Sequence, residues 1–348
     1  MRKDILVFDA TLRDGSHAIK HQLELETVNH YCSMIDNAGL YTIVVGHGNG
    51  LGASSLQVGL SKHTDEELLS TARKALKKTK LGAYMIPGFG TIDDNLLPAI
   101  DNGVELFKIG CHCTEADVTR EHIEFLAKHE KEVYGVLMMT HMASPERLLE
   151  EVQKMESYGA RGVILMDSAG AFLPSDVRNK VEMLVDNVNI RIGFHAHNNL
   201  GLAVGNTLTA LECGASIIDG TVCGFGAGAG NCPIEAVVPI LQRQGLLSQI
   251  DFYNLLDASD AVVRKEIGYQ KSMDSTSIVS GLSGVFSAFA VHVKNAAEQY
   301  NVDPRDIYQE LGKRKVVGGQ EDLVVDVAIY LSQKKKKDDS SYVMESLL

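Results

Sequence analysis

Short apolar runs alternate with amphipathic segments along the first 244 residues of the chain. Each apolar run has the length of a buried strand. Eight such runs occur, at Ile5–Phe8, Tyr41–Gly46, Leu81–Ile86, Val104–Ile109, Val133–Met139, Gly162–Met166, Ile190–His195 and Ile217–Val222. Strict alternation of strands and helices predicts a parallel sheet, and eight repeats favour a closed barrel over an open sheet. We therefore expect a (β/α)8 TIM barrel of the α/β class.

A segment with helical periodicity follows each run. These segments lie near residues 26–37, 65–78, 93–102, 115–129 and 145–158, from residue 174 onward, and near 201–213 and 234–244. Thr64 and Glu67 have the spacing of a capping box before the second segment, and Pro145 suits the first turn of the fifth. No Gly-x-Gly-x-x-Gly motif follows the first strand, which disfavours a dinucleotide-binding fold.

The pattern changes after about residue 250. Asp251–Glu266 is typical of one more helix, and Gly281–Ser287 is typical of a small-residue loop. Further helices are expected near Val285–Tyr300, Pro304–Leu311 and Glu321–Leu331, with no ninth strand.

This change of pattern predicts three parts of the chain. Residues 1–272 form the barrel that carries the chemistry. Residues 273–333 form a small C-terminal helical domain docked on the barrel. Residues 334–348 form a run of charges that is typical of a disordered tail.

Composition narrows the class of protein. The 348 residues carry a net charge of −12, with a pI near 5.5, which argues against a nucleic-acid binder. No run of about 18 apolar residues is present, and the chain enters its first strand almost directly, so we expect neither a membrane span nor a signal peptide. Six cysteines without a Cys-x-x-Cys pair indicate reduced thiols in a cytoplasmic protein.

Polar residues gather where the predicted strands end. In a barrel of this class the chemistry lies at the carboxyl ends of the strands. The residues that follow the strands are Asp9, Arg13 and Asp14, then His47 and Asn49, His112, Thr140 and His141, Asp167 and Ser168, and finally His195 and His197. The amino ends of the strands lack such clusters, so the sequence predicts one functional face.

Asp14, His195 and His197 are the candidate metal ligands. Side chains two apart on a strand point to the same side, so the two histidines face one point. One carboxylate with two imidazoles suits manganese, magnesium, iron or cobalt, and no cysteine is placed to favour zinc. Arg13 beside Asp14 is either a structural ion pair or a group that stabilises negative charge on the substrate. His17 is either a loop histidine or a general base.

A glycine-rich loop, Gly224–Asn231, follows the eighth strand. Such a loop either cradles a phosphate through backbone amides or lets Asn231 approach the metal site. We favour the second interpretation.

Several motifs together resemble the 4-hydroxy-2-oxovalerate aldolases, a family of metal-dependent pyruvate aldolases in the hydroxymethylglutaryl-CoA lyase-like superfamily. The motifs lie at residues 9–22, 85–91, 166–170, 195–201, 226–231 and 319–328, and so extend over nearly the whole chain. The first and last of them are specific to the aldolases, whereas His195–Asn199 is shared across the superfamily.

The resemblance implies a manganese enzyme, with magnesium or cobalt as alternatives, that splits a 4-hydroxy-2-oxo acid reversibly into pyruvate and an aldehyde. It implies the metal ligands proposed above, Arg13 on the enolate and His17 as base. It also implies substrate contacts from Ser168, from His195, and from Tyr84 and Ile86 in the aldehyde pocket. It further implies a role in aromatic hydrocarbon catabolism and an acylating aldehyde dehydrogenase as a partner that docks on the C-terminal helical domain, residues 273–333. It is also consistent with an oligomer.

The chain departs from the family pattern in three places. Leu282 and Phe286 stand where the family has tyrosines, so we expect Phe286 to contact the substrate without a hydroxyl and stereochemical control to be relaxed. Asn49 replaces an aspartate, and the lysine-rich tail weakens the inference of a dehydrogenase partner. These changes suggest a divergent member with its own aldehyde.

Two alternatives to an aldolase stay open at this point. A Claisen-type condensing enzyme of the isopropylmalate or citramalate synthase kind would share His195–Asn198 and Ala229–Asn231. A barrel kept only as a non-catalytic scaffold for a dehydrogenase would have no need of the intact Arg13, Asp14 and His17.

Overall fold

Eight parallel strands close into a barrel in chain order, which confirms the predicted fold. The computed structural model describes residues 4–270 and 273–345. The strands are β1 (Leu6–Asp9), β2 (Thr42–Val44), β3 (Lys80–Met85), β4 (Leu106–His112), β5 (Glu132–Met138), β6 (Gly162–Asp167), β7 (Arg191–Ala196) and β8 (Ile217–Gly220). Pairing of β1 with β8, from Leu6 opposite Ile217 to Asp9 opposite Gly220, closes the ring.

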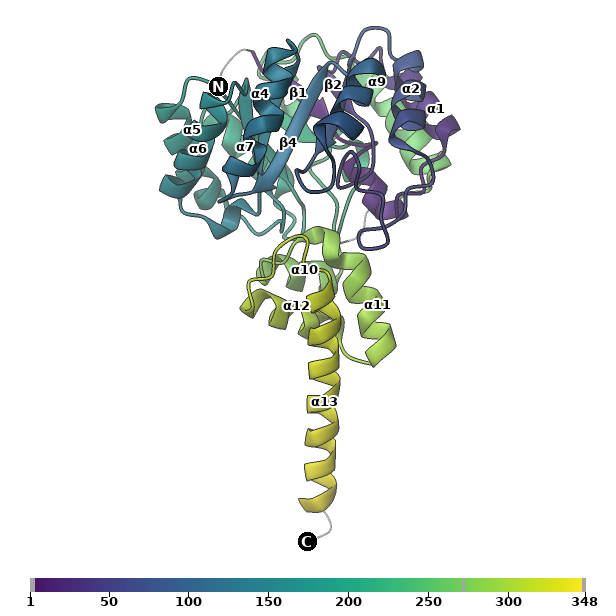
Figure 1. The fold of residues 1–348 in the computed structure, drawn as a ribbon, viewed down its shortest axis with the longest axis vertical. Coiled ribbons are helices and arrows are strands. Elements are labelled where there is room, and N and C mark those ends of the chain that lie inside the picture. The colour runs from purple at the N-terminus through teal and green to yellow at the C-terminus, as the bar shows by residue number, and fades with distance from the viewer. Residues whose placement is uncertain (1–3, 271–272, 346–348) are drawn as a thin grey trace.

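Helices surround the barrel (Figure 1). They are α1 (Leu25–Ile35), α2 (Asp65–Ala75), α3 (Leu97–Asp101), α4 (Arg120–Lys128), α5 (Pro145–Ser157), α6 (Pro174–Asn187), α7 (Ala203–Glu212) and α8 (Ile234–Gln242). Thr64 caps α2 in the predicted capping box with Glu67. The segment expected as one helix near 251–266 is α9 (Phe252–Ala258), which continues as a π-helical stretch, η6 (Ser259–Glu266).

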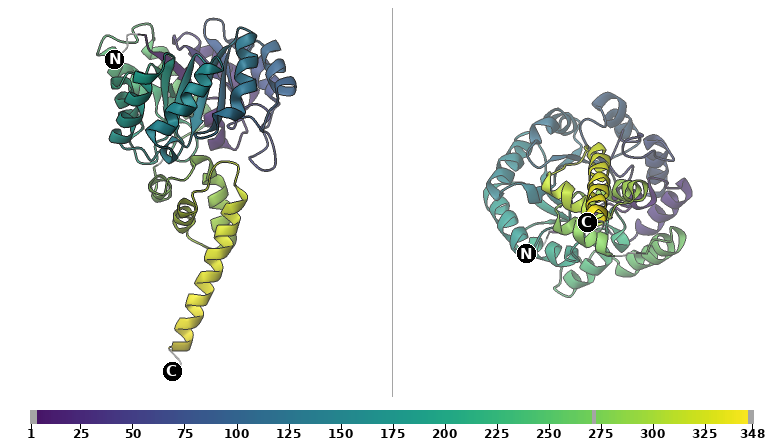
Figure 2. Two further views of the ribbon diagram at one scale, coloured as in Figure 1. Left: turned by 60° about the vertical axis from the view of Figure 1, so that its left-hand side comes forward. Right: turned by 90° about the horizontal axis from the view of Figure 1, so that it is seen from below.

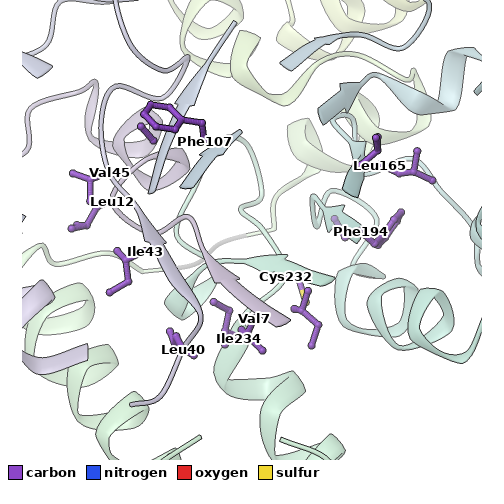
Figure 3. Close-up of a cluster of buried hydrophobic side chains, with 14 of the residues drawn as sticks. Val7, Leu12, Leu40, Ile43, Val45, Phe107, Leu165, Phe194, Cys232 and Ile234 are labelled. Carbon is purple, nitrogen blue, oxygen red and sulfur yellow. The ribbon is translucent and has the colours of Figure 1, made fainter. Parts of the chain in front are cut away.

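Side chains alternate between two cores along each strand. Val7 and Ile43 point outward and pack with Ile234 in the core between strands and helices (Figure 3). Phe8 points into the barrel, where it joins Tyr84 and other residues in a second buried cluster. Burial of each large apolar side chain contributes roughly 1.5–3 kcal/mol, so both cores fix the strand register that places the residues at the strand ends.

Four helices form a smaller unit with its own core at one end of the barrel. They are α10 (Ser275–Leu282), α11 (Ala290–Tyr300), α12 (Pro304–Lys313) and α13 (Asp322–Glu345), and their buried residues form a separate cluster. Viewed from below, these helices lie across the middle of the barrel (Figure 2, right). Several hydrogen bonds tie them to the carboxyl ends of the strands. For example, His141 Nε2 bonds the Gly284 carbonyl at 3.0 Å, and the Ser287 amide donates to the Ser168 carbonyl at 2.9 Å.

The sequence left two features of this region unpredicted. Helix α10 was not expected; the Asp274 side chain caps it by accepting from the Ser277 amide. A disordered tail was expected at 334–348 and stays a prediction, whereas α13 continues to Glu345 and projects from the body (Figures 1 and 2). Lysine and glutamine are good helix formers, and a helix that has already nucleated in a packed segment extends easily.

The remaining expectations for the domain boundaries fall on residues that the structure does not describe, or next to them. Residues 346–348 lie outside the described part of the chain. The expected boundary between residues 272 and 273 adjoins residues 271–272, which are also outside it, so the boundary stays a prediction. Among the described residues, no helix combines the length and apolarity that crossing a bilayer requires.

Candidate active site

Asp14, His195 and His197 come together at the carboxyl end of the barrel, as predicted. Each offers one ligand atom, these atoms lie within 4.8 Å of one another, and all three residues are buried. His197 Nδ1 faces the Asp167 carbonyl oxygen at 3.1 Å, and its Nε2 lies 4.0 Å from Asp14 Oδ1. A proton on Nδ1 that is donated to this carbonyl leaves Nε2 free as a ligand atom, which is the usual arrangement of metal-binding histidines.

Asn231 lies directly beside these three residues. Its Nδ2 donates to Asp14 Oδ1 at 2.7 Å, and its Oδ1 lies 3.1 Å from His195 Nε2. A Cβ at Gly226 would lie 2.1 Å from Asn231 Nδ2 and 2.6 Å from Asp14 Oδ1, so this glycine permits the close approach. The loop after β8 thus brings Asn231 to the candidate ligands, which confirms the favoured interpretation over the phosphate cradle.

Arg13 lies beside the candidate ligands and has unused hydrogen-bond donors. Its Nη1 donates to Asp14 Oδ2 at 2.8 Å and to the Gly48 carbonyl at 3.2 Å. Its Nε and Nη2 are buried without a hydrogen-bond partner in the described part of the chain. The guanidinium lies over the Tyr84 ring, 4.7 Å from its centroid. Buried donors are normally satisfied, so the two free N–H groups mark a place for an anionic or carbonyl oxygen of a ligand.

The charge state of Asp14 follows from its neighbours. Burial alone would raise the pKa of this carboxyl, but Arg13 and the imidazoles of His197 and His195 outweigh it and hold the pKa far below its usual value of 3.8. Asp14 is therefore ionised at neutral pH, as a metal ligand must be.

His17 lies on η1 (Asp14–Ile19), a 3-10 helix that follows Arg13. Its ring packs against Gly48, where a Cβ would lie 2.4 Å from His17 Nε2. Burial lowers the pKa of His17 below its usual 6.5; Asp14 opposes this shift and Arg13 adds to it. The imidazole is thus neutral at pH 7 and able to accept a proton.

Two further histidines pack beside His17. His21 contacts the His17 ring edge-on, with centroids 5.0 Å apart, and stacks on His47 with centroids 3.6 Å apart. His47 was expected on this face, but His21 was missed because it follows η1 rather than the strand end.

One cavity collects most of the predicted site residues. Arg13, Asp14, His17, Tyr84, Ile86, His197 and Phe286 all line it, together with Asn49, Met138 and Met166. Met138 and Met166 were missed, although both lie at strand ends where the same rule applies. Phe286 comes from the helical unit, so this unit covers the cavity on the side away from the barrel.

Two predicted substrate contacts do not line the cavity. Ser168 is buried behind it, and its Oγ accepts a hydrogen bond from the Met139 amide at 2.9 Å. His195 lies beneath the cavity, with its Nε2 toward Asn231. His112 and His141 also lie outside; the latter bonds Gly284 of the helical unit.

Comparison with known proteins agrees with this geometry. Residues 4–262 match the HMGL-like family model, and residues 271–333 match a DmpG-like communication domain. A 4-hydroxy-2-oxovalerate aldolase of Pectobacterium atrosepticum is 49% identical over 97% of this chain and 98% of its own length. One from Spirochaeta aurantia is 49% identical over 94% of this chain and 96% of its own.

The fold also resembles a more distant solved structure. The carboxyl transferase domain from Rhizobium etli pyruvate carboxylase superposes with a TM-score of 0.78 at 16% identity, covering 96% of this chain and 61% of the other. At that identity the likeness concerns the fold alone, whereas the sequence matches settle the family. The chain belongs to the HMGL-like family, within the group of the 4-hydroxy-2-oxovalerate aldolases, and carries the DmpG-like communication domain.

Proposed function

We propose that this protein is a class II aldolase that cleaves a 4-hydroxy-2-oxo acid, such as 4-hydroxy-2-oxovalerate, reversibly into pyruvate and an aldehyde. The observation that carries the proposal is the pair of unpartnered Arg13 donor atoms beside the Asp14–His195–His197 cluster, at a cavity that Arg13, Asp14 and His197 line. The relatives at 49% identity, which are named as 4-hydroxy-2-oxovalerate aldolases, support it.

Asp14, His195 and His197 would hold a divalent metal ion. We propose manganese, with magnesium or cobalt as alternatives, because one carboxylate and two imidazoles with open positions suit these ions and no thiolate is present among the three residues. When bound, the ion would supply a Lewis acid for the substrate carbonyl.

Arg13 stabilises the charge that develops when the carbon–carbon bond breaks. Cleavage between C3 and C4 leaves its electron pair on the pyruvate fragment, which becomes an enolate. The free Nε–H and Nη2–H groups of Arg13 meet the negative oxygens in a buried site, where such donors are most effective. Because Nη1 is already bonded to Asp14, the guanidinium is held in place before the substrate arrives.

His17 takes the proton from the 4-hydroxyl group during cleavage. The C4–oxygen bond becomes the carbonyl of the aldehyde as the C3–C4 bond breaks, so the hydroxyl must lose its proton to a base. His17 is neutral at pH 7 and lines the cavity, and it returns the proton in the condensation direction. In the cleavage direction, the enolate accepts a proton at C3 to become pyruvate, which balances the proton that His17 has taken.

The remaining cavity residues form the aldehyde pocket. Tyr84, Ile86 and Phe286 make its wall, and Phe286 supplies no hydroxyl to select one face of the aldehyde. Ser168 is fully buried and does not line the cavity, so its contact with the substrate stays a prediction.

The test is a screen in the condensation direction. Metal-loaded protein is incubated with pyruvate and aldehydes of increasing chain length, and also with acetyl-CoA and 2-oxo acids. We expect 4-hydroxy-2-oxo acids to form from the aldehydes, with little stereochemical preference. Release of free thiol from acetyl-CoA would instead support the Claisen-type condensing enzyme, and no product in any arm would support a scaffold without activity.

The communication domain suggests a partner for the aldehyde product. We propose an acylating aldehyde dehydrogenase, on the basis of the match over residues 271–333 and of the position of that unit over the cavity mouth. A dehydrogenase from an organism with such an aldolase should co-elute with this protein on gel filtration, and separate elution at micromolar concentrations would count against the pairing.

A further inference from the structure

A buried ion pair crosses the inside of the barrel below the cavity. Lys108 Nζ on β4 pairs with Asp219 Oδ2 on β8, and both side chains are fully buried. Neither residue lines the cavity. Removing two charges from water costs several kcal/mol per ion, and an apolar pair of the same size is often at least as stable. Packing alone therefore does not account for the pair.

Asp219 also faces a candidate metal ligand. His195 and Asp219 are direct neighbours in the register between β7 and β8. Asp219 Oδ2 lies 3.4 Å from His195 Nδ1, and this nitrogen has no hydrogen-bond partner elsewhere in the described chain. The opposite nitrogen, Nε2, points to the cluster with Asn231 and Asp14.

The position of one proton links these two observations. If His195 Nε2 is to bind a cation, it must be unprotonated, so the proton of the neutral ring must lie on Nδ1. Asp219 is the acceptor that faces this position. His197 meets the same requirement with a backbone carbonyl, that of Asp167. A carboxylate acceptor makes an imidazole a stronger ligand than a carbonyl does.

We propose that the Lys108–Asp219 pair is a positioning device for His195. Asp219 holds the proton on Nδ1 and fixes the ring, and Lys108 fixes the carboxylate and balances its charge. The inference rests on the proposed function in one respect, the binding of a divalent cation at Asp14, His195 and His197. Lys108 and Asp219 do not touch the substrate, so they are positioning residues and not catalytic ones.

The test is the affinity of the full-length, metal-stripped protein for Mn²⁺, measured from the electron paramagnetic resonance signal of the free ion. In Asp219→Asn, the amide oxygen would accept a hydrogen bond from Lys108, so the amide NH₂ group would face His195 Nδ1. This favours a proton on Nε2, the nitrogen that must bind the cation. We expect the Kd for Mn²⁺ to rise about 10- to 100-fold, as is usual for the partner of a metal-binding histidine.

A second variant separates positioning from folding. Lys108→Met combined with Asp219→Leu replaces both charges by apolar groups of similar size, which keeps the barrel packed but removes the acceptor. We expect the melting temperature of the metal-free protein to stay near the wild-type value while the Kd rises as in the single variant. The visible spectrum of the Co²⁺-loaded double variant should also shift, because His195 binds in an altered orientation.

Asp36→Asn is the matched control. Asp36 is a buried carboxylate at the end of α1 that accepts from the backbone amides of Lys77, Lys78 and Thr79, at the amino end of β3. This variant should melt earlier than wild type but bind Mn²⁺ unchanged. A folded double variant with the wild-type Kd and Co²⁺ spectrum would overturn the positioning role. Failure of the wild type itself to bind Mn²⁺ would overturn the proposed metal site, a distinguishable result.

Discussion

Identical side chains behave differently in this barrel because their neighbours differ. Asp9 and Asp14 are both buried near the end of β1. Burial raises the pKa of Asp9 to about 6, even though hydrogen bonds from Thr11 and Tyr31 oppose the rise. Asp14 has Arg13 and two imidazoles around it, and its pKa is lowered instead. Asp14 is therefore fully ionised across the neutral range, whereas the pKa of Asp9 lies only just below that range.

The protonation of His17 leads to a prediction for the pH dependence of activity. Its pKa is lowered by burial, so the neutral form persists as the pH falls through 6.5. We expect kcat/KM to fall on the acid side only below pH 6.5. His129→Ala, which changes an exposed histidine remote from the cavity, should leave the acid side of the pH profile unchanged. An acid limb at or above pH 6.5, or one that persists in His17→Ala, would contradict the assignment of His17 as base.

At the scale of single elements, loops position the site as much as strands do. The loop after β8 supplies Asn231, and its backbone passes so close to Asp14 that only glycine fits at position 226. The sequence indicated this loop through its glycines alone. By contrast, the loop from α2 to β3 contains no glycine and depends on Asp36 at the end of α1, whose carboxylate accepts from the amides of Lys77, Lys78 and Thr79.

Gly226→Ala tests the role of the β8 loop. The added methyl group would overlap Asn231 Nδ2 and Asp14 Oδ1, so one or both must move. We expect Mn²⁺ affinity to fall by about ten-fold or more, as when a partner of a metal ligand is lost. Gly205→Ala in α7 meets no atom within 4 Å and should leave Mn²⁺ binding unchanged. Equal affinity of the two variants would show that the loop tolerates a side chain.

Asp36→Asn tests how the Asp36 carboxylate holds the loop before β3, through the pH dependence of the free energy of unfolding. Burial opposes ionisation of Asp36, but the amides of Thr79, Lys78 and Lys77 outweigh it, and the pKa is lowered from 3.8. A lowered pKa in the folded state stabilises the protein above pH 3.8, and this contribution is lost as the pH falls further. We expect a loss of about 1 kcal/mol at pH 7, with solvent screening taken into account. Urea unfolding at pH 7 and pH 3 measures it; an undiminished difference at pH 3 would contradict this account.

At the scale of the whole molecule, the periodicity of the chain predicted more than its individual residues did. Alternating strands and helices determine a barrel, and a barrel brings every strand end to one face, so Arg13, Asp14 and His197 were found from position alone. Lys108 and Asp219 were not, because each is a single charge inside an apolar run. Only closure of the ring places β4 opposite β8. Helix α10 was missed because its sequence, with three serines, a threonine and a glycine among eight residues, has weak helix propensity.

The long C-terminal helix gives a prediction at this scale. Among residues 322–335, the part of α13 whose side chains are described, the buried residues are Val324, Val327 and Ala328, which lie in the first two turns; the far end of the helix projects from the body (Figures 1 and 2). Removal of residues 336–348 should therefore change the free energy of unfolding by no more than about 0.5 kcal/mol, as for surface changes, and leave turnover intact. A marked fall in melting temperature or activity would assign the projecting end a role in this chain.

The most direct test of the account is pyruvate release from 4-hydroxy-2-oxovalerate by wild type and by Arg13→Ala, with the metal content of each protein measured in parallel. The account predicts release by the Mn²⁺-loaded wild type. It predicts a fall of about 10² to 10³-fold or more in kcat for the variant, as when a preorganised donor to an oxyanion is removed, at unchanged metal content. No pyruvate from the wild type, or near-normal turnover by Arg13→Ala, would contradict it.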